Sequence, residues 1–382
     1  MLSILFVLHS HICGGAEKHL LMLMQGLSQR GYRTAFAGPE DSWLMEQVRG
    51  SGLTGYHLPM HGMFDLWSAL RLAALVQDFR ADLIHSHLTR GARYAGLAGT
   101  MTGVPVVATA HSTNAGKHFG GAGRIIAVSE AVGRFLVSRG YDRRRIVIVP
   151  NGIPDIRCST RPLPLRQNLG LSEDIQLIGV VGRFIPDKGQ DIALDAMSRL
   201  RHPAHLALIG DDSTPWGREM RLRADSGAAQ GRLHFLGFRD DLPVRMCELD
   251  LLVAPSRREA LSLTLIESAA AGIPAIASRI GGIPEVVMDG ETGILVPPDD
   301  PVGLAVAIDS LMDDPALRSR LGAAARRRYE NGFTLDSMLD ATEDVYRQMQ
   351  PYGRSGRRTV KLKRSHPSAR TSKNNLPSAS AR

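Results

Sequence analysis

Short apolar runs alternate with helix-length amphipathic stretches along most of this 382-residue chain, and this alternation constrains the fold more than any other feature. The apolar runs are short, rich in Ile, Val, Leu and Ala, and often end at Gly or Pro, as is typical of strands buried on both faces of a parallel sheet. A repeated strand–helix order predicts an α/β fold with doubly wound sheets.

The alternation occurs in two series. The first series has predicted strands at residues 4–8, 33–38, 83–87, 106–110, 125–129 and 146–150, with helices between them, such as 16–30, 65–80 and 89–102. The second has strands at 177–182, 205–210, 232–237, 250–256, 274–278 and 292–297, closed by helices at 302–313, 315–331 and 335–350. We therefore expect two Rossmann-like domains facing each other across a cleft, which is the default ligand site in such folds.

A proline-rich, aperiodic segment after residue 150 indicates the connection between the two domains. We predict an N-terminal Rossmann-like domain at 1–155, a C-terminal Rossmann-like domain at 156–333, a helix at 334–350 that returns to the first domain, and a disordered basic tail at 351–382.

Charge is distributed unevenly along the chain. Residues 1–150 carry fifteen basic and nine acidic groups, residues 151–350 carry twenty-two and twenty-nine, and the tail carries nine and none. The tail is either a solvated end without a role or a segment attracted to an anionic membrane surface. Nucleic acid is not expected as a partner, because the basic residues are not interleaved with aromatic ones.

The remaining composition indicates a cytoplasmic protein. No apolar run is long enough to span a membrane, and residues 1–10 lack the basic start and cleavage site of a signal peptide. Three scattered cysteines, Cys13, Cys158 and Cys247, predict reduced thiols.

Two loops at strand ends predict phosphate binding. Gly14 and Gly15 precede a helix, where paired glycines allow a close approach of backbone to ligand, although a tight turn explains them equally well. Arg183 and Lys188 flank a turn at the first strand of the second domain, where they can neutralise a phosphate. The GxGxxG fingerprint of NAD enzymes is absent.

The segment REALSLTLIE at 258–267 holds two glutamates eight positions apart. Glu259 is predicted to lie in the loop after a strand. Ser262 is predicted to cap a helix that carries Glu267 about 7.5 Å further along its axis. The amides of Leu263 and Thr264 at the helix start suit an anion. A ligand with a sugar, a diphosphate and a ribose would engage all of these groups.

With these features, residues 1–350 resemble the family-4 retaining glycosyltransferases, which have the two-domain GT-B fold. The similarity is carried by GGAEKHLLML, HSH, VPVVATAHS, VSEAV, VPNGI, GRFIPDKGQD and SRREALSLTLIESAAAGIPAIASRIGGIPEVV. The E-x₇-E motif of the family falls on Glu259 and Glu267. This chain departs from the family pattern at Ala260, where the family usually has Gly, so we expect the donor pocket to differ in detail if that position needs a positive φ.

The resemblance implies a role for each matching residue. Arg183 and Lys188 would neutralise the donor diphosphate, Glu259 would position the donor sugar, and Glu267 would hold the ribose. The amides of Leu263 and Thr264 would bind sugar and phosphate. Gly15 would lie against the donor from the first domain, and His111 would lie near the sugar. Neither a metal nor another cofactor is expected, and alternating histidines at 9–11 and 85–87 have few acidic neighbours to support a metal site.

We expect the protein to transfer a hexose, with retention, from a UDP- or GDP-linked sugar to a hydroxyl of a glycan or lipid-linked acceptor in surface polysaccharide or lipopolysaccharide synthesis. Peripheral attachment to the inner face of the cell membrane is a further expectation. Two alternatives stay open: a nucleotide-sugar epimerase of similar architecture, and a non-catalytic protein that binds sugar nucleotides.

Overall fold

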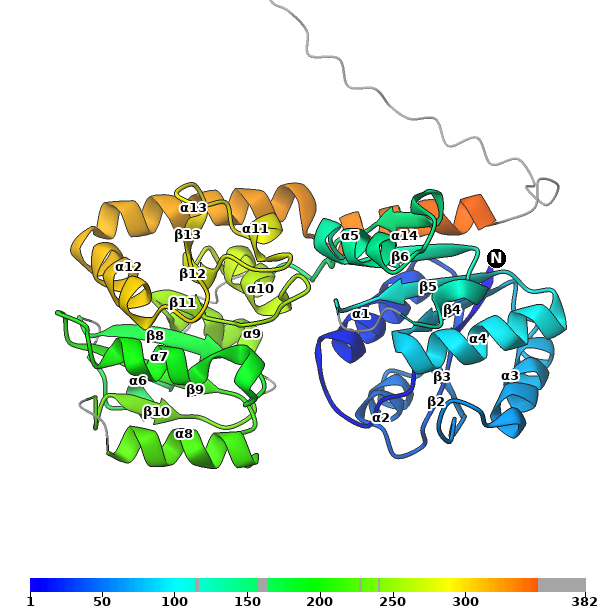
Figure 1. The fold of residues 1–382 in the computed structure, drawn as a ribbon, viewed down its shortest axis with the longest axis horizontal. Helices are drawn as coiled ribbons and strands as arrows, with labels where there is room; N and C mark the ends of the chain where they lie inside the picture. Colours follow the sequence, from blue (N-terminus) through cyan, green and yellow to red (C-terminus); the bar gives the residue numbers. More distant parts are fainter. Residues whose placement is uncertain (114–116, 157–163, 173, 227–228, 240, 350–382) are drawn as a thin grey trace, which may run out of the picture. The chain divides into compact units, whose positions relative to one another are not determined.

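The computed structural model describes residues 1–113, 117–156, 164–172, 174–226, 229–239 and 241–349. The predicted tail and part of the predicted connection lie outside these ranges. Two parallel sheets organise the described chain (Figure 1), with strand orders β3-β2-β1-β4-β5-β6-β7 and β10-β9-β8-β11-β12-β13. The prediction of two Rossmann-like α/β domains is confirmed.

In the first domain the strands other than β3 begin and end close to the predicted apolar runs. They are β1 Ser3–Val7, β2 Arg33–Gly38, β3 Thr54–His57, β4 Leu83–His87, β5 Val106–Ala110, β6 Arg124–Ala127 and β7 Ile146–Ile148. The helices are α1 Gly15–Gln29, α2 Trp43–Gly50, α3 Leu66–Asp78, α4 Leu88–Thr102 and α5 Glu130–Ser138. Strands β1, β4 and β5 are buried along their whole length, which explains the largely apolar sequences of β1 and β5. Strand β4 also buries the polar side chains of His85, Ser86 and His87.

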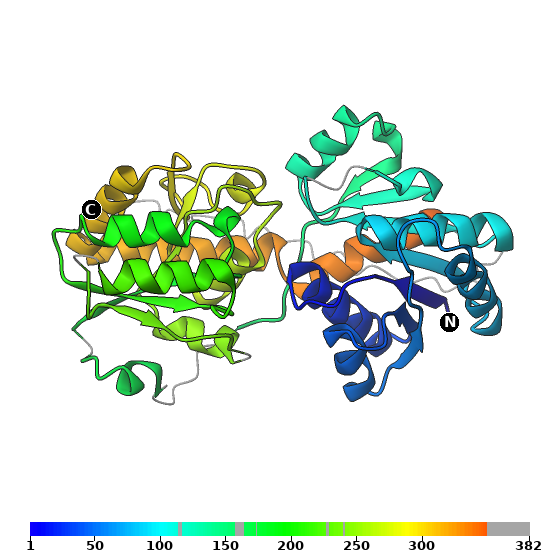
Figure 2. The ribbon, with the colours of Figure 1, turned by 60° about the horizontal axis from the view of Figure 1, so that its bottom comes forward.

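The second domain follows the same plan. Its strands are β8 Gln176–Val181, β9 Ala204–Ile209, β10 Leu233–Phe235, β11 Leu251–Ala254, β12 Ala275–Ser278 and β13 Gly293–Val296. Its helices are α6 Pro164–Asn168, α7 Gln190–Met197, α8 Pro215–Asp225, α9 Leu242–Arg245, α10 Leu263–Ala271, α11 Ile283–Val286, α12 Pro301–Asp313 and α13 Pro315–Gly332. Figure 2 shows helices on both sides of the sheet, which bury its two faces.

The last helix, α14 Leu335–Met349, packs on α1 rather than on the domain that precedes it in sequence. Its buried residues Met338, Leu339, Val345 and Tyr346 belong to one apolar cluster with Phe6 and other side chains of the first domain. The chain therefore crosses between the domains twice, and residues Ile153 and Thr334 form a β-bridge where the two crossings meet.

Two features differ from the sequence-based expectations. The edge strand β3 was not predicted, because its residues TGYH include a glycine and lack an apolar run; pairing with β2 makes it a strand. Cys247 is disulfide-bonded, so the expectation of reduced thiols is wrong for this residue and the cysteines do not support a cytoplasmic location. In the described residues, every helix is too short or too polar to cross a membrane.

Candidate functional site

The strand order of the second sheet brings the two predicted phosphate and sugar loops together. Strands β8 and β11 are neighbours, so the loops that follow them emerge side by side. The amide of Arg257 donates to the carbonyl of Asp187 at 2.8 Å and ties one loop to the other. Gly189 has φ +67°, and a Cβ on it would lie 2.0 Å from the carbonyl oxygen of Pro255, so only glycine allows this approach.

Lys188 and Glu259 meet at the junction of these loops. Lys188 lies in the 3₁₀ turn Pro186–Lys188, and its Nζ is 2.5 Å from Oε2 of Glu259. Both side chains are largely buried, with 24% and 14% of their surface exposed. Arg183 is exposed and pairs with no carboxylate among the described residues. In the described residues, one of these two cations is thus paired with a carboxylate, and the other is not.

Helix α10 begins directly beyond Glu259. Ser262 is its N-cap, as predicted, and its side chain accepts from the amide of Leu265 at 3.5 Å. The backbone of Ser262 has φ +70° and ψ +98°, an unfavourable conformation for a residue with a side chain. The amides of Leu263 and Thr264 have no hydrogen-bond partner within the described chain, which leaves them able to bind an anion.

Glu267 lies one turn further along α10. Burial raises the pKa of its carboxyl, and Lys18 on α1 partly opposes this by its positive charge. Gly15, at the start of α1, faces the same helix: a Cβ on it would lie 3.5 Å from the Leu263 side chain. Gly14 is the N-cap of α1. The predicted residues of the first domain therefore approach the start of α10.

Two glycines that were not singled out in the sequence pack against the loop that carries Glu259 and Ala260. A Cβ on Gly281 would lie 1.9 Å from the carbonyl oxygen of Glu259, and a Cβ on Gly282 would lie 1.9 Å from that of Ala260. Ala260 itself has no positive φ, so its methyl group is compatible with the backbone. The paired glycines in the sequence GGIPE, residues 281–285, are the feature from which this close contact could have been predicted.

His111 follows β5 in the first domain and belongs to a network of buried imidazoles. Its Nε2 lies 2.9 Å from Nδ1 of His87, and its ring meets that of His19 edge to face. Burial, together with the neighbouring histidines, holds the pKa of His111 well below its usual value. The ring is therefore neutral near pH 7 and can form hydrogen bonds without carrying charge. His19 was not predicted as a site residue, because nothing in the sequence of α1 distinguishes it from the other residues of the helix.

His19, His87 and His111 are also the one group in the described residues whose side chains could share a metal ion, with ligand atoms within 4.8 Å of one another. Imidazole is a suitable ligand for zinc and similar ions, and Nε2 of His87 is buried without a hydrogen-bond partner. In the structure, however, Nδ1 of His87 is bonded to His111, and no carboxylate belongs to the group. The geometry permits a metal but does not require one.

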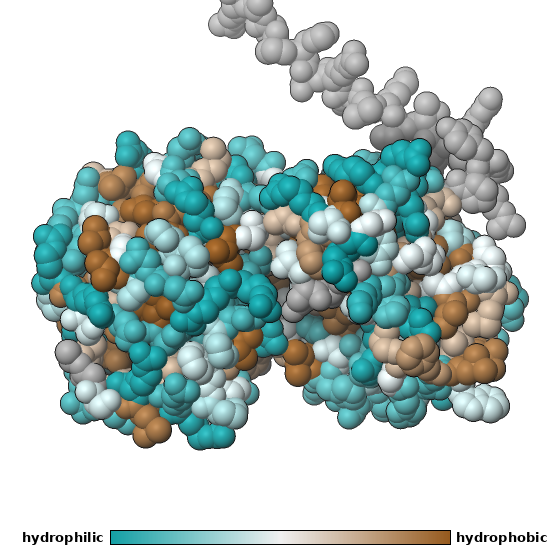
Figure 3. Space-filling view, in the orientation of Figure 1, coloured by the Kyte–Doolittle hydropathy of each residue, from teal (hydrophilic) through white to brown (hydrophobic). Residues whose placement is uncertain are grey.

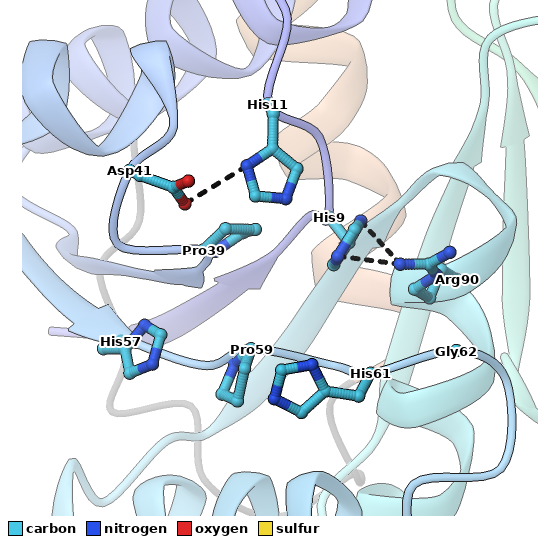
Figure 4. Close-up of a pocket in the computed structure, with 9 residues that line it drawn as sticks. All are labelled: His9, His11, Pro39, Asp41, His57, Pro59, His61, Gly62 and Arg90. Atoms are coloured by element: carbon cyan, nitrogen blue, oxygen red, sulfur yellow. Dashed lines mark hydrogen bonds and ion pairs between the residues drawn. The ribbon is translucent and has the colours of Figure 1, made fainter.

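A separate pocket of about 560 Å³ lies at the carboxyl ends of β1, β2 and β3 in the first domain. Figure 4 shows the rings of His9 and His11 across the pocket from His57, Pro59 and His61, with Arg90 at one end. Its remaining walls are Pro39, Asp41 and Gly62. The volume is that of a small-molecule site. Apart from His9 and His11, none of these residues stood out in the sequence.

Comparison with known proteins assigns the chain and its fold to a class. A family model for Glycosyltransferase Family 4 matches residues 13–157, and one described as Glycosyl transferases group 1 matches residues 164–328. The chain therefore belongs to the glycosyltransferases, in agreement with the resemblance noted from its motifs.

Two related proteins are similar to this chain over most of its length. The chain is 31% identical to the glycogen synthase of Mycobacterium tuberculosis over 342 residues, covering 79% of each protein. It is 30% identical to the D-inositol 3-phosphate glycosyltransferase of Xylanimonas cellulosilytica over 391 residues, covering 88% of this chain and 92% of the relative.

Solved structures share the fold at lower identity. Anabaena HepE in complex with UDP and glucose superimposes with a TM-score of 0.83 at 21% identity, covering 91% of this chain and all of HepE. WaaG, a glycosyltransferase involved in lipopolysaccharide biosynthesis, gives a TM-score of 0.68 at 18% identity, covering 90% and 99% of the two chains. The two-domain GT-B architecture is thus confirmed.

Proposed function

We propose that this glycosyltransferase moves a hexose from a UDP- or GDP-linked sugar to a hydroxyl of a glycan or glycolipid, with retention of anomeric configuration, in the synthesis of a surface polysaccharide. The observation that carries the proposal is the meeting of Lys188, Glu259 and the uncapped amides of Leu263 and Thr264 at neighbouring strand ends. The exposed Arg183 lies on the same loop as Lys188.

The chemistry follows from the charges that develop. The bond from C1 of the sugar to the diphosphate oxygen breaks, and a bond from C1 to the acceptor oxygen forms on the same face. The acceptor proton passes to the leaving phosphate. Arg183 and the α10 amides stabilise the departing diphosphate without having to reorganise, and Lys188 does so once it leaves its ion pair with Glu259. Stabilisation of this kind is generally a large part of catalysis. The carboxylate of Glu259 would then lose its ion pair with Lys188 and accept hydrogen bonds from sugar hydroxyls instead.

His111 and Glu267 complete the donor site in this proposal. The neutral ring of His111 would form a hydrogen bond with the donor sugar, and Glu267 would accept from the ribose hydroxyls. The reaction needs no metal in this scheme, because side chains and amides supply the positive charge.

A donor screen tests the proposal. Purified protein is mixed with UDP- and GDP-linked hexoses, and thermal stabilisation and nucleotide release are measured with and without candidate acceptors. Transfer requires an acceptor, and the product has the anomeric configuration of the donor. An epimerase would isomerise the donor alone, and a binding protein would be stabilised without turnover. Either result would exclude the proposal.

We also propose that the protein is cytoplasmic and attaches to the inner face of the membrane, because an apolar surface surrounds the start of α3. Phe64 and Trp67 have 84% and 82% of their surface exposed, and Leu66 and Leu70 have 66% and 45%. In Figure 3, apolar atoms gather over the region of α3. The guanidinium of Arg93 stacks on Phe64 at 4.6 Å, and Arg71 is exposed on α3. Aromatic rings next to arginines suit an anionic lipid interface.

Vesicle sedimentation tests this attachment. We expect binding to vesicles with anionic lipid at low salt, and loss of binding in the double variant Phe64→Ser, Trp67→Ser. The double variant Val302→Ser, Val306→Ser is the control, because these residues expose 58% and 64% of their surface on α12. Equal sedimentation of both double variants would show that the α3 surface is not the attachment site.

A further inference from the structure

The pocket at the ends of β1, β2 and β3 is lined by one guanidinium, that of Arg90, by four imidazole rings and by one carboxylate, that of Asp41. Arg90 on α4 is half-buried, and its Nη1 lies 2.8 Å from Nε2 of His9 and 3.3 Å from the carbonyl oxygen of Met60. No carboxylate among the described residues forms an ion pair with it. A partly buried guanidinium usually has a carboxylate partner, so its absence indicates that an anionic ligand takes that place.

The histidines supply further donors around the same space. Nδ1 of His57 is buried and has no hydrogen-bond partner. His9 and His11 pack edge to face at 5.2 Å between ring centres, and His61 is exposed at the opposite wall. Figure 4 shows all four rings bordering one space. Donors arriving from several directions match a tetrahedral oxyanion better than a planar one.

The one acidic lining residue does not cancel this charge. Asp41 lies 3.1 Å from Nδ1 of His11, and both side chains are exposed, with 79% and 51% of their surface accessible. Glu40, the other acid near His57, is held by Arg49. Arg90, at the far end of the pocket from Asp41 in Figure 4, therefore keeps its charge unpaired.

We propose that this pocket binds a phosphate group carried by the acceptor, with Arg90 as its main anchor and the four histidines as further donors. The proposal rests on the transferase function above and specifies its acceptor as a phosphorylated polyol, sugar or lipid headgroup. It assigns Arg90, His9 and His57 to acceptor recognition.

Proton uptake should accompany binding. Burial, Arg90 and His11 lower the pKa of His9 in the unliganded protein, so this ring is neutral near pH 7. A phosphate next to it would favour the protonated ring. The groups that face His9 and the other rings are His11, Asp41, His57, His61, Arg90 and, near His57, Glu40. We expect phosphate binding to be about threefold or more tighter at about pH 6.5 than at about pH 8.

Calorimetric titration with glucose 6-phosphate tests the site in the full-length protein saturated with UDP, which keeps the donor site filled. Binding is expected for the wild type and for Arg134→Gln, an exposed arginine on α5 that serves as the control. Arg90→Gln is expected to weaken binding about tenfold or more. Arg90→Lys should retain part of the affinity, because it keeps the charge but loses the planar fork.

Several outcomes would overturn the proposal. These are equal binding of glucose and glucose 6-phosphate, equal affinity of the Arg90→Gln and Arg134→Gln proteins, or an affinity that does not rise at the lower pH. If Arg90→Gln does not fold, His61→Gln serves instead, because this side chain is exposed. Vesicles with phosphatidic acid, compared with glucose 6-phosphate, separate a lipid phosphate from a soluble one.

The two proposals fail in different ways. UDP binding and slow hydrolysis of a sugar nucleotide report on the donor site alone. If these are present and phosphate does not bind at Arg90, the acceptor inference is wrong and the transferase proposal stands. If UDP does not bind at all, the donor site is wrong, and the same titration carried out without UDP reports on the pocket alone.

Discussion

Lys188 and Glu259 form an ion pair at 2.5 Å, although 71 residues separate them in sequence. The pair places a cation at the position where the donor diphosphate would leave. Removing it takes away stabilisation of the transition state, so Lys188→Ala should lower kcat/KM by about 100-fold or more. Initial rates of transfer from the preferred donor measure the loss. The control is Arg134→Gln, which should keep normal turnover; turnover near wild type in Lys188→Ala would show that the phosphate role is wrong.

Ser262 holds a strained backbone at the start of α10. Glycine tolerates φ +70° and ψ +98°, whereas alanine keeps the strain and loses the capping hydroxyl. We expect Ser262→Gly to be more stable than Ser262→Ala by roughly 1 kcal/mol in the free energy of unfolding. Urea unfolding measures both variants. A higher stability of Ser262→Ala than of Ser262→Gly would contradict a strained backbone at Ser262.

Gly282 packs against the carbonyl oxygen of Ala260 at a distance that no Cβ could occupy. Gly282→Ala should therefore destabilise the protein by about 2 kcal/mol or more and weaken UDP binding, since the loop must move. Gly50→Ala is the matched control, because a Cβ there meets nothing within 4 Å and φ is not positive. Equal unfolding midpoints for the two variants would contradict the close approach.

Stability should fall in acid because buried histidines stay neutral. Burial lowers the pKa of His19 to about 4 and that of His85 to about 3. In the unfolded chain both titrate near 6.5, so below that pH the unfolded state binds more protons and the free energy of unfolding decreases. Each ring contributes about 1.4 kcal/mol per pH unit, from pH 6.5 down to its folded pKa.

Urea unfolding across this pH range measures the effect. His19→Gln should reduce the dependence between about pH 6.5 and 4, whereas Arg134→Gln, at an exposed position on α5, should leave it unchanged. If His19→Gln and the wild type lose stability in parallel, His19 is not a buried neutral ring.

Transfer should survive removal of metal ions. The proposed reaction uses Lys188, Arg183 and backbone amides as its positive groups, so dialysis against a chelator should leave the rate within about twofold of the untreated protein. If the rate is lost and zinc restores it, the cluster of His19, His87 and His111 is the place where the ion binds.

The two-domain architecture and most strands could be predicted from the sequence, because strands buried on both faces are mostly apolar along their length. The sequence also placed Arg183, Lys188 and Glu259 in loops that follow strands and predicted the Ser262 cap, since motifs at strand ends and helix starts are local. Strand β3 shows the limit: TGYH has no apolar run, and β2 supplies the pairing that makes it extended.

Which loops lie next to each other depends on the order of the strands in the folded sheet, and no local pattern encodes it. The order β8-β11 joins Lys188 to Glu259, and the contact of Gly282 with Ala260 depends on β12 lying beside β11. The pocket around Arg90 combines residues at the carboxyl ends of β1, β2 and β3 with one residue of α4. The distances between these residues cannot be read from a single sequence. Side chains that are distant in the chain become neighbours because strands pack next to each other in a sheet. A local sequence pattern predicts only the secondary structure of a segment and the residues that it buries.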